Sequence, residues 1–141
     1  MNGWLLRYDG YDPDNEPLRE ALCTLGNGRW ASRGAAPEAA AGGAHYPGTY
    51  VAGVFNRLSV DVDGQSVETA SLVNLPTWQS LTSRGEDGPW LDVDSQAVSD
   101  YVQVLDLRRG VLVRRFRITD DNGLVTAVAQ RRIVSMADPF C

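Results

Sequence analysis

The sequence predicts an all-β fold, an antiparallel β-sandwich with very little helix. Short runs rich in β-branched and aromatic residues are separated by turn signals about every 8–12 residues, which is typical of a sandwich. Asn122-Gly123 is the strongest hairpin signal in the chain. The length of 141 residues allows one domain with a modest core. We therefore expect residues 1–141 to form a single domain.

The first half of the chain is turn-rich but carries several strand candidates. Residues 3–8 suggest a short strand, and residues 18–25 (LREALCTL) fit either one helical turn or a strand. Residues 49–62 (TYVAGVFNRLSVDV) are a good strand candidate, in which Gly53 marks a bulge or a close contact. One or two further strands are expected within residues 65–82.

The second half predicts three antiparallel strands in a meander, at residues 101–107, 111–119 and 124–136. Alternation along the middle strand places four residues on one face: Leu112, Arg114, Phe116 and Ile118. A two-residue turn at Asn122-Gly123 would place a second set beside them: Ala127, Ala129, Arg131 and Ile133. Two like charges on this apolar face require a carboxylate, a bulge or the end of the sheet, unless they bind a ligand.

Composition excludes some classes of partner. The net charge is −5 and the pI about 4.7, the wrong sign for general binding to nucleic acid or to an anionic membrane. Two cysteines, Cys23 and Cys141, are too few for a disulfide framework. Cys23 stands in an apolar run and is expected to be a buried free thiol, and Cys141 is the last residue of the sequence. We see neither a signal peptide nor an apolar run of about 18 residues. These features predict a cytoplasmic protein.

The catalytic inventory is thin. His45 is the single histidine, and the cysteines are too few and too scattered for a zinc site. The glycines around Asn27 do not complete a nucleotide-binding loop, and no G-x-S-x-G sequence is present. Paired carboxylates such as Asp92 and Asp94 flank turns, where they are expected to be solvated. The sequence therefore predicts no catalytic residue, no metal and no cofactor.

Aromatic side chains offer a different kind of site. Trp78 and Trp90 lie near loops, and Tyr46 and Tyr50 bracket the turn Pro47-Gly48-Thr49. Flat aromatic faces together with arginine forks suit sugar rings and hydroxyls. The alternative is that these aromatics belong to the core and to corners of the fold.

Two long motifs carry a family resemblance. LREALCTLGNGRWASRGAAPE at 18–38 and HYPGTYVAGVFNRL at 45–58 resemble the N-terminal domain of glycoside hydrolase family 65. Val73-Asn74-Leu75-Pro76 and RRIVSMADP at 131–139 are also similar to the family, so the resemblance runs nearly end to end. Arg29-Trp30-Ala31-Ser32 departs from it, because many members have an aromatic, an aliphatic and a glycine before the Arg-Gly pair.

The resemblance implies an accessory role. In the family this domain is a large β-sandwich of the galactose-mutarotase-like type that precedes a catalytic (α/α)6 barrel. Family members are inverting maltose, trehalose and kojibiose phosphorylases and related α-glucoside hydrolases, with inorganic phosphate as co-substrate in the phosphorylases. Residues 1–141 resemble only the opening part of that sandwich, so the barrel and its catalytic acid have no counterpart here. We expect the partners to be the barrel of the parent chain and disaccharide α-glucosides, with a homodimer as a further candidate.

Within the stretch from Thr24 to Ala35, Leu25-Gly26-Asn27-Gly28 predicts a tight turn, and Arg33-Gly34 follows it. Arg33 is expected to pin the loop at 45–50 through a carboxylate or a carbonyl, with Glu20 and Glu38 as candidate carboxylates, or else to face the sugar pocket of the barrel. Four residues are accordingly predicted to lie next to substrate: Arg33, His45, Tyr46 and Tyr50. A stand-alone carbohydrate-binding or oligomerisation module remains the alternative function.

Overall fold

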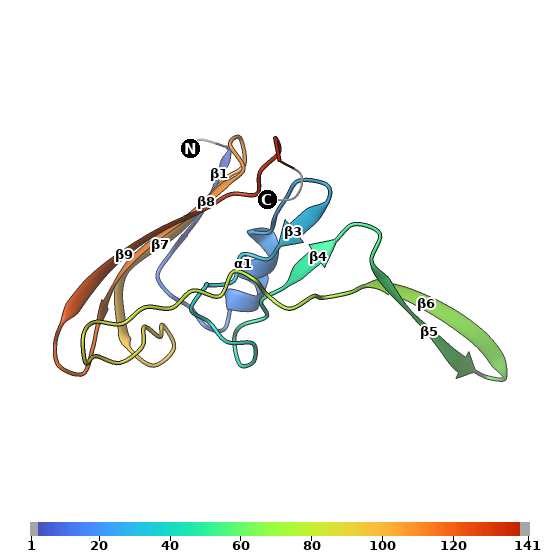
Figure 1. Ribbon diagram of the computed structural model, residues 1–141, viewed down its shortest axis with the longest axis horizontal. Coiled ribbons are helices and arrows are strands. Elements are labelled where there is room, and N and C mark those ends of the chain that lie inside the picture. Colours follow the sequence, from blue (N-terminus) through green and yellow to red (C-terminus); the bar gives the residue numbers. More distant parts are fainter. Residues whose placement is uncertain (1–2, 139–141) are drawn as a thin grey trace.

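The computed structural model describes residues 3–138 and consists mainly of antiparallel strands. Figure 1 shows a curved four-stranded sheet at one end, a central layer with one short helix and short strands, and a hairpin that extends away at the other end. The prediction of an all-β sandwich with very little helix is confirmed. No helix within residues 3–138 is long and apolar enough to cross a membrane.

The four-stranded sheet has the order β1-β7-β8-β9, and all neighbours are antiparallel. Its members are β1 (Leu5–Asp9), β7 (Ala97–Asp106), β8 (Val111–Thr119) and β9 (Val125–Arg132). The predicted meander is therefore confirmed, and β1 adds an edge strand beside β7. Alternation along β8 buries its four even-numbered residues Leu112, Arg114, Phe116 and Ile118, as expected for a sheet with one face toward the core.

The predicted register between β8 and β9 is wrong by one residue. Thr119 pairs with Val125, because Gly123 donates its N–H to the Asp120 carbonyl and Asp120 donates to the Leu124 carbonyl, which makes a wider loop. The Asp120 carboxylate accepts the N–H groups of Asn122 and Leu124, and only Gly123 takes a positive φ of 79°. This is a three-residue loop with a glycine bulge rather than a two-residue turn.

The shift of one residue exchanges the faces of β9. Arg132 is paired with Leu112, and Gln130 is paired with Arg114. The side chains of Arg132 and Gln130 therefore lie on the buried face of the sheet. The residues predicted there lie on the opposite face or beyond the strand: Ala127, Ala129, Arg131 and Ile133. The two arginines near the core are therefore Arg114 and Arg132, not Arg114 and Arg131.

The central layer combines α1 (Glu16–Leu22) with a three-stranded sheet. That sheet has the order β2-β3-β4, with β2 (Leu25–Gly26), β3 (Trp30–Ser32) and β4 (Thr49–Val51). The ambiguous segment at 18–25 thus divides into most of a helix and the start of a strand. Gly34 follows β3 and lies so close to α1 that an added Cβ would be 2.5 Å from the Cβ of Cys23. Only glycine fits there without displacing Cys23.

The strand predicted at 49–62 is two strands, because Gly53 adopts a φ of 83° and breaks the run after β4. The remainder is β5 (Phe55–Val62), which pairs with β6 (Gln65–Leu72) in the extended hairpin of Figure 1. Asp63 and Gly64 make its two-residue turn, both with positive φ. All sixteen residues of these two strands are exposed, and one face carries an apolar patch of Leu58, Val60, Val62 and Val67.

Two clusters of buried side chains lie against the four-stranded sheet, the first shared with the central layer and the second with the segment before β7. One joins Cys23 and Leu25 to Leu105 and Leu112, and the second gathers Val93, Tyr101, Phe116 and Ile118. Cys23 is a buried free thiol, as predicted. Cys141 lies outside the described residues.

Candidate functional site

The loop at 42–50 is attached to α1 through Glu20. Pro17 stands in the first turn of α1, where its missing N–H costs no helical hydrogen bond, and the one-turn spacing puts Glu16 and Glu20 on the same buried face. The Glu20 side chain is fully buried, and its two oxygens contact the loop. Oε1 lies 2.7 Å from Nδ1 of His45, and Oε2 accepts the backbone N–H of Tyr46 at 2.9 Å.

His45 continues this network toward the surface. Its side chain is 3% exposed, and its Nε2 lies 3.1 Å from the Tyr11 hydroxyl and 3.3 Å from Oδ2 of Asp94. Tyr11 also donates its hydroxyl proton to Asp94. The result is a chain of polar side chains from Glu20, through His45, to Tyr11 and the half-exposed Asp94.

Two carboxylates set the charge of the imidazole. The hydrogen bond that His45 donates to Glu20 raises the pKa of His45 above its ordinary 6.5, burial opposes the rise, and the charge of Asp94 adds to it. Burial and the bond to Asp94 also raise the pKa of Tyr11 well above its usual range. The network therefore favours a protonated His45 held between two carboxylates, which is a structural ion pair with an exposed end.

Arg33 pins the same loop, but not through a carboxylate. Its Nη2 donates to the carbonyl of Pro17 at 3.0 Å, its backbone N–H donates to the carbonyl of Gly48 at 2.9 Å, and its guanidinium lies over the ring of Tyr46 at 5.2 Å. The expected partners Glu20 and Glu38 are engaged elsewhere, since Glu20 binds His45. The guanidinium thus bonds to a carbonyl of α1, while the loop itself is held by the Arg33 backbone N–H and by the contact with the Tyr46 ring. The carboxylate candidates are wrong.

A second buried network crosses from the 35–40 segment to the four-stranded sheet. Glu38 makes an ion pair with Arg114, and its other oxygen lies 3.4 Å from Nε2 of Gln130. Arg132, on the same face, donates to the carbonyls of Arg33 at 2.9 Å and Ala35 at 2.7 Å. Burial, together with repulsion from Arg132, lowers the pKa of Arg114 to about 9. A carboxylate thus does meet the charge on this face, as one sequence alternative required.

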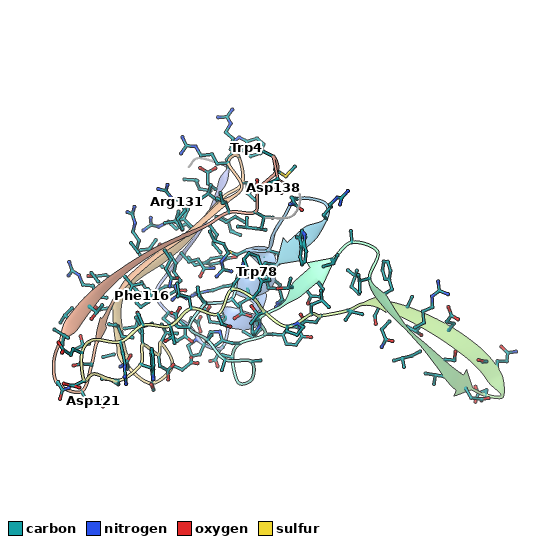
Figure 2. All side chains as sticks on the ribbon, in the orientation of Figure 1. Trp4, Trp78, Phe116, Asp121, Arg131 and Asp138 are labelled. Carbon is teal, nitrogen blue, oxygen red and sulfur yellow. The ribbon has the colours of Figure 1, made fainter. Side chains whose placement is uncertain are left out.

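Two hollows flank Trp78, whose side chain is 63% exposed. One has a volume of about 480 Å³ and mixes apolar walls with the polar side chains of Gln79, Gln103, Arg114 and Arg132. The other has a volume of about 590 Å³ and is mostly apolar, with Trp30, Leu75 and Ile133 in its wall. Figure 2 shows Trp78 near the middle of the molecule, between the four-stranded sheet and the hairpin.

The four predicted site residues lie close together. The guanidinium of Arg33 lies over the ring of Tyr46, which follows His45 in the loop held by Glu20. Tyr50 belongs to β4, and a Cβ added to Gly48 would be 3.0 Å from the Tyr50 hydroxyl and 2.9 Å from Cδ of Arg33. None of the four lines either hollow beside Trp78. Trp90 lies apart from both hollows and packs against Arg84.

Sequence reasoning missed the residues that complete these networks. They are Tyr11, Asp94, Gln103 and Arg132, with Glu38 assigned to the wrong arginine. Asp120, two residues before Asn122-Gly123, was a signal for a three-residue loop between β8 and β9. A loop of that length places Arg132 on the inner face.

Comparison with known proteins decides the family. The model of glycosyl hydrolase family 65, N-terminal domain, matches residues 6–141. The chain belongs to this family. The resemblance noted in the motifs is thereby confirmed. Within family 65, an uncharacterized glycosyl hydrolase of Mycobacterium tuberculosis is 52% identical over 136 residues, which are 96% of this chain and 10% of that protein.

Two phosphorylases of family 65 are more distant relatives. Trehalose 6-phosphate phosphorylase of Lactococcus lactis is 33% identical over 91% of this chain, and kojibiose phosphorylase of Caldanaerobacter subterraneus is 32% identical over 96%. The chain covers 16% of each. A solved structure from the human microbiome, provisionally assigned as a kojibiose phosphorylase, superimposes with a TM-score of 0.82 at 22% identity over 95% of this chain and 18% of that one. This last likeness shows the shared fold.

Proposed function

We propose that this chain is the N-terminal β-sandwich of a family 65 α-glucoside phosphorylase or hydrolase, which supports a catalytic (α/α)6 barrel and is not catalytic alone. The observation that carries the proposal is coverage: nearly the whole chain matches relatives of which it spans only 10% to 16%. The ionisable groups of the His45 network support it, because they pair with one another and do not line either hollow beside Trp78.

The proposal extends to carbohydrate metabolism in the cytoplasm. Disaccharide α-glucosides are the proposed substrates of the whole protein, with inorganic phosphate as co-substrate if it is a phosphorylase. The names of the phosphorylase relatives support this substrate class. A homodimer stays a prediction, for which the exposed apolar face of the β5–β6 hairpin is the candidate surface. A monomer in light scattering at high protein concentration would contradict it.

An activity assay tests the proposal directly. The 141-residue chain is incubated with maltose, trehalose and kojibiose, with and without inorganic phosphate, and glucose and glucose 1-phosphate are measured. We expect no turnover above the buffer blank, because within residues 3–138 no carboxyl group lines either hollow beside Trp78, and glycoside cleavage needs an acid and a base on opposite sides of the sugar. Turnover that survives repurification and follows the protein through a sizing column would refute a purely supporting role.

A carbohydrate-binding module is the second candidate function. The observation in its favour is the exposed indole of Trp78, which stands beside a hollow of about 590 Å³. If this candidate is right, disaccharides change the tryptophan fluorescence, and Trp78→Phe abolishes the change while Trp90→Phe leaves it intact. No change in tryptophan fluorescence with any of maltose, trehalose and kojibiose at millimolar concentrations would count against it.

A further inference from the structure

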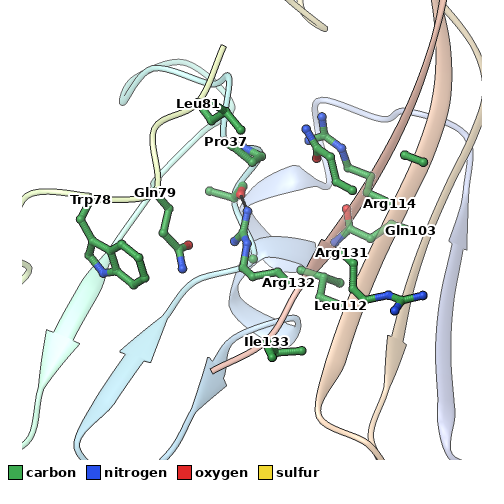
Figure 3. A pocket seen from close by; sticks show the side chains of 14 residues that line it. Pro37, Trp78, Gln79, Leu81, Gln103, Leu112, Arg114, Arg131, Arg132 and Ile133 are labelled. Atoms are coloured by element: carbon green, nitrogen blue, oxygen red, sulfur yellow. Dashed lines mark hydrogen bonds between the residues drawn. The ribbon is translucent and has the colours of Figure 1, made fainter. Parts of the chain in front are cut away.

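The hollow of about 480 Å³ is built on the inner face of β8 and β9. Figure 3 shows Gln103, Arg114 and Arg132 on the side of the sheet, with Trp78 and Gln79 across the space. The volume suits a compact small molecule. The walls thus combine arginine and amide donors with the ring of one tryptophan.

One of the two guanidinium groups beside this hollow has no carboxylate bonded to it in the part of the chain that the structure describes. Arg114 is 6% exposed and has Glu38 as its carboxylate partner. Arg132 is held by two backbone carbonyls, and no carboxylate within residues 3–138 is bonded to it. Glu38 is therefore the one carboxylate within ion-pair distance of these two guanidinium groups in the described structure, while Glu16 and Glu20 act on Arg114 and Arg132 from farther away. Burial, together with repulsion from Arg132, lowers the pKa of Arg114. An anion in the hollow would give Arg132 a direct partner.

The hollow also holds donors without an oxygen or nitrogen acceptor. Nε of Arg114 is buried and unpaired in the described structure, and so is Nε2 of Gln103, whose side chain is 1% exposed. Gln103 cannot turn its amide over cheaply, because its oxygen accepts the Tyr101 hydroxyl at 2.8 Å. The Gln103 side chain also interacts with the Cys23 thiol, whose sulfur is a weak acceptor. Buried donors of this kind call for an acceptor from outside.

We propose that this hollow binds a small oxyanion of the phosphate class, either inorganic phosphate or the phosphate group of a sugar phosphate. A phosphate oxygen accepts several hydrogen bonds at once and so satisfies Gln103 and Arg114 together. Its charge balances the second arginine. Trp78 at the rim offers a ring face to a sugar attached to the phosphate.

Calorimetric titration of the 141-residue chain tests the proposal. The probes are inorganic phosphate and glucose 6-phosphate, with neutral glucose and sodium chloride at matched ionic strength as blanks. We expect both phosphates, or glucose 6-phosphate alone, to bind with a dissociation constant of about 1 mM or tighter, and the blanks to be silent. Comparable heats from phosphate and glucose 6-phosphate would identify the free ion as the ligand. Tighter binding of glucose 6-phosphate that Trp78→Ala removes would identify the sugar phosphate.

Matched variants locate the site. Gln79→Glu places a negative charge in the hollow while keeping an acceptor for the Ser32 hydroxyl, which now donates to Gln79. Gln65→Glu adds the same charge on the distant hairpin. We expect the first to weaken phosphate binding about tenfold and the second to leave it unchanged. Gln103→Leu, checked for folding by circular dichroism, should weaken it to a similar degree.

Three results would overturn the proposal. They are no binding of either phosphate at about 10 mM, equal weakening by Gln79→Glu and Gln65→Glu, and undiminished binding by a folded Gln103→Leu chain. Because the readout is binding and not turnover, these results leave the supporting role proposed for the chain untouched.

Discussion

Glu38→Ala is expected to destabilise the fold by about 3–5 kcal/mol, because it leaves the buried guanidinium of Arg114 without its carboxylate. Arg132 adds repulsion on the same face, and Glu16 opposes it only from farther away, without an ion pair to Arg114 in the described structure. The loss is a large part of the free energy that holds a domain of this size. Urea unfolding followed by far-ultraviolet circular dichroism measures it, and we expect a much lower midpoint than for the unmodified chain.

A double variant separates charge burial from lost packing. Glu38→Ala combined with Arg114→Leu removes both charges, and we expect it to recover much of the loss, since an apolar replacement of a buried ion pair is often neutral. Glu68→Ala is the exposed control, because its pair with Arg57 lies at 3.5 Å in solvent. An unfolding free energy equally insensitive to Glu38→Ala and Glu68→Ala would show that the buried pair contributes nothing.

Strands were predictable where the local sequence pattern alone determines their type and bounds. β8 was predicted at its observed bounds, because β-branched and aromatic residues alternate between a turn at Gly110 and one at Asp120. Helix α1 was not decided, since its seven residues are too few to show a helical period and Pro17 marks only a boundary. Its helical state depends on the buried contacts of Glu16 and Glu20, which a local pattern does not contain.

Turn chemistry accounts for the error in register. Asp63-Gly64 and Asn122-Gly123 are both strong hairpin signals, yet only the first makes a two-residue turn with both residues at positive φ. At the second, the Asp120 carboxylate accepts two backbone N–H groups and widens the loop by one residue. One residue was enough to exchange Arg131 for Arg132 on the inner face.

The candidate site was predictable in position but not in pairing. The motif around Arg33 contacts the loop at 45–50, as the residue types and turn signals predicted. The choice of carboxylate for each cation is a long-range event: Glu38 and Arg114 are 76 residues apart in sequence, and Asp94 meets His45 across 49. Such choices depend on which faces the assembled sheets bury, so a single sequence leaves them open.

Glu20→Ala is expected to destabilise the fold more at pH 6 than at pH 8. The raised pKa of His45 means that the folded state binds a proton more tightly than the unfolded chain. That stabilisation is fully present below about pH 6.5, the ordinary value for histidine, and is lost as the pH rises through the folded pKa. At pH 6 the variant leaves a buried imidazolium without its main partner, a loss of about 3–5 kcal/mol.

At pH 8 the imidazole can lose its proton, so the remaining loss is that of the acceptor for the Tyr46 N–H, about 1–3 kcal/mol. Unfolding curves at both pH values measure the difference, and Asp94→Asn serves as the control at the exposed end of the network. His45→Asn should flatten the dependence between pH 6 and 8, because histidine is the side chain whose ordinary pKa lies in this range. A loss that is the same at both pH values, or larger at pH 8, would show that Glu20 acts on the backbone of the loop alone and that the charge of His45 plays no part in holding it.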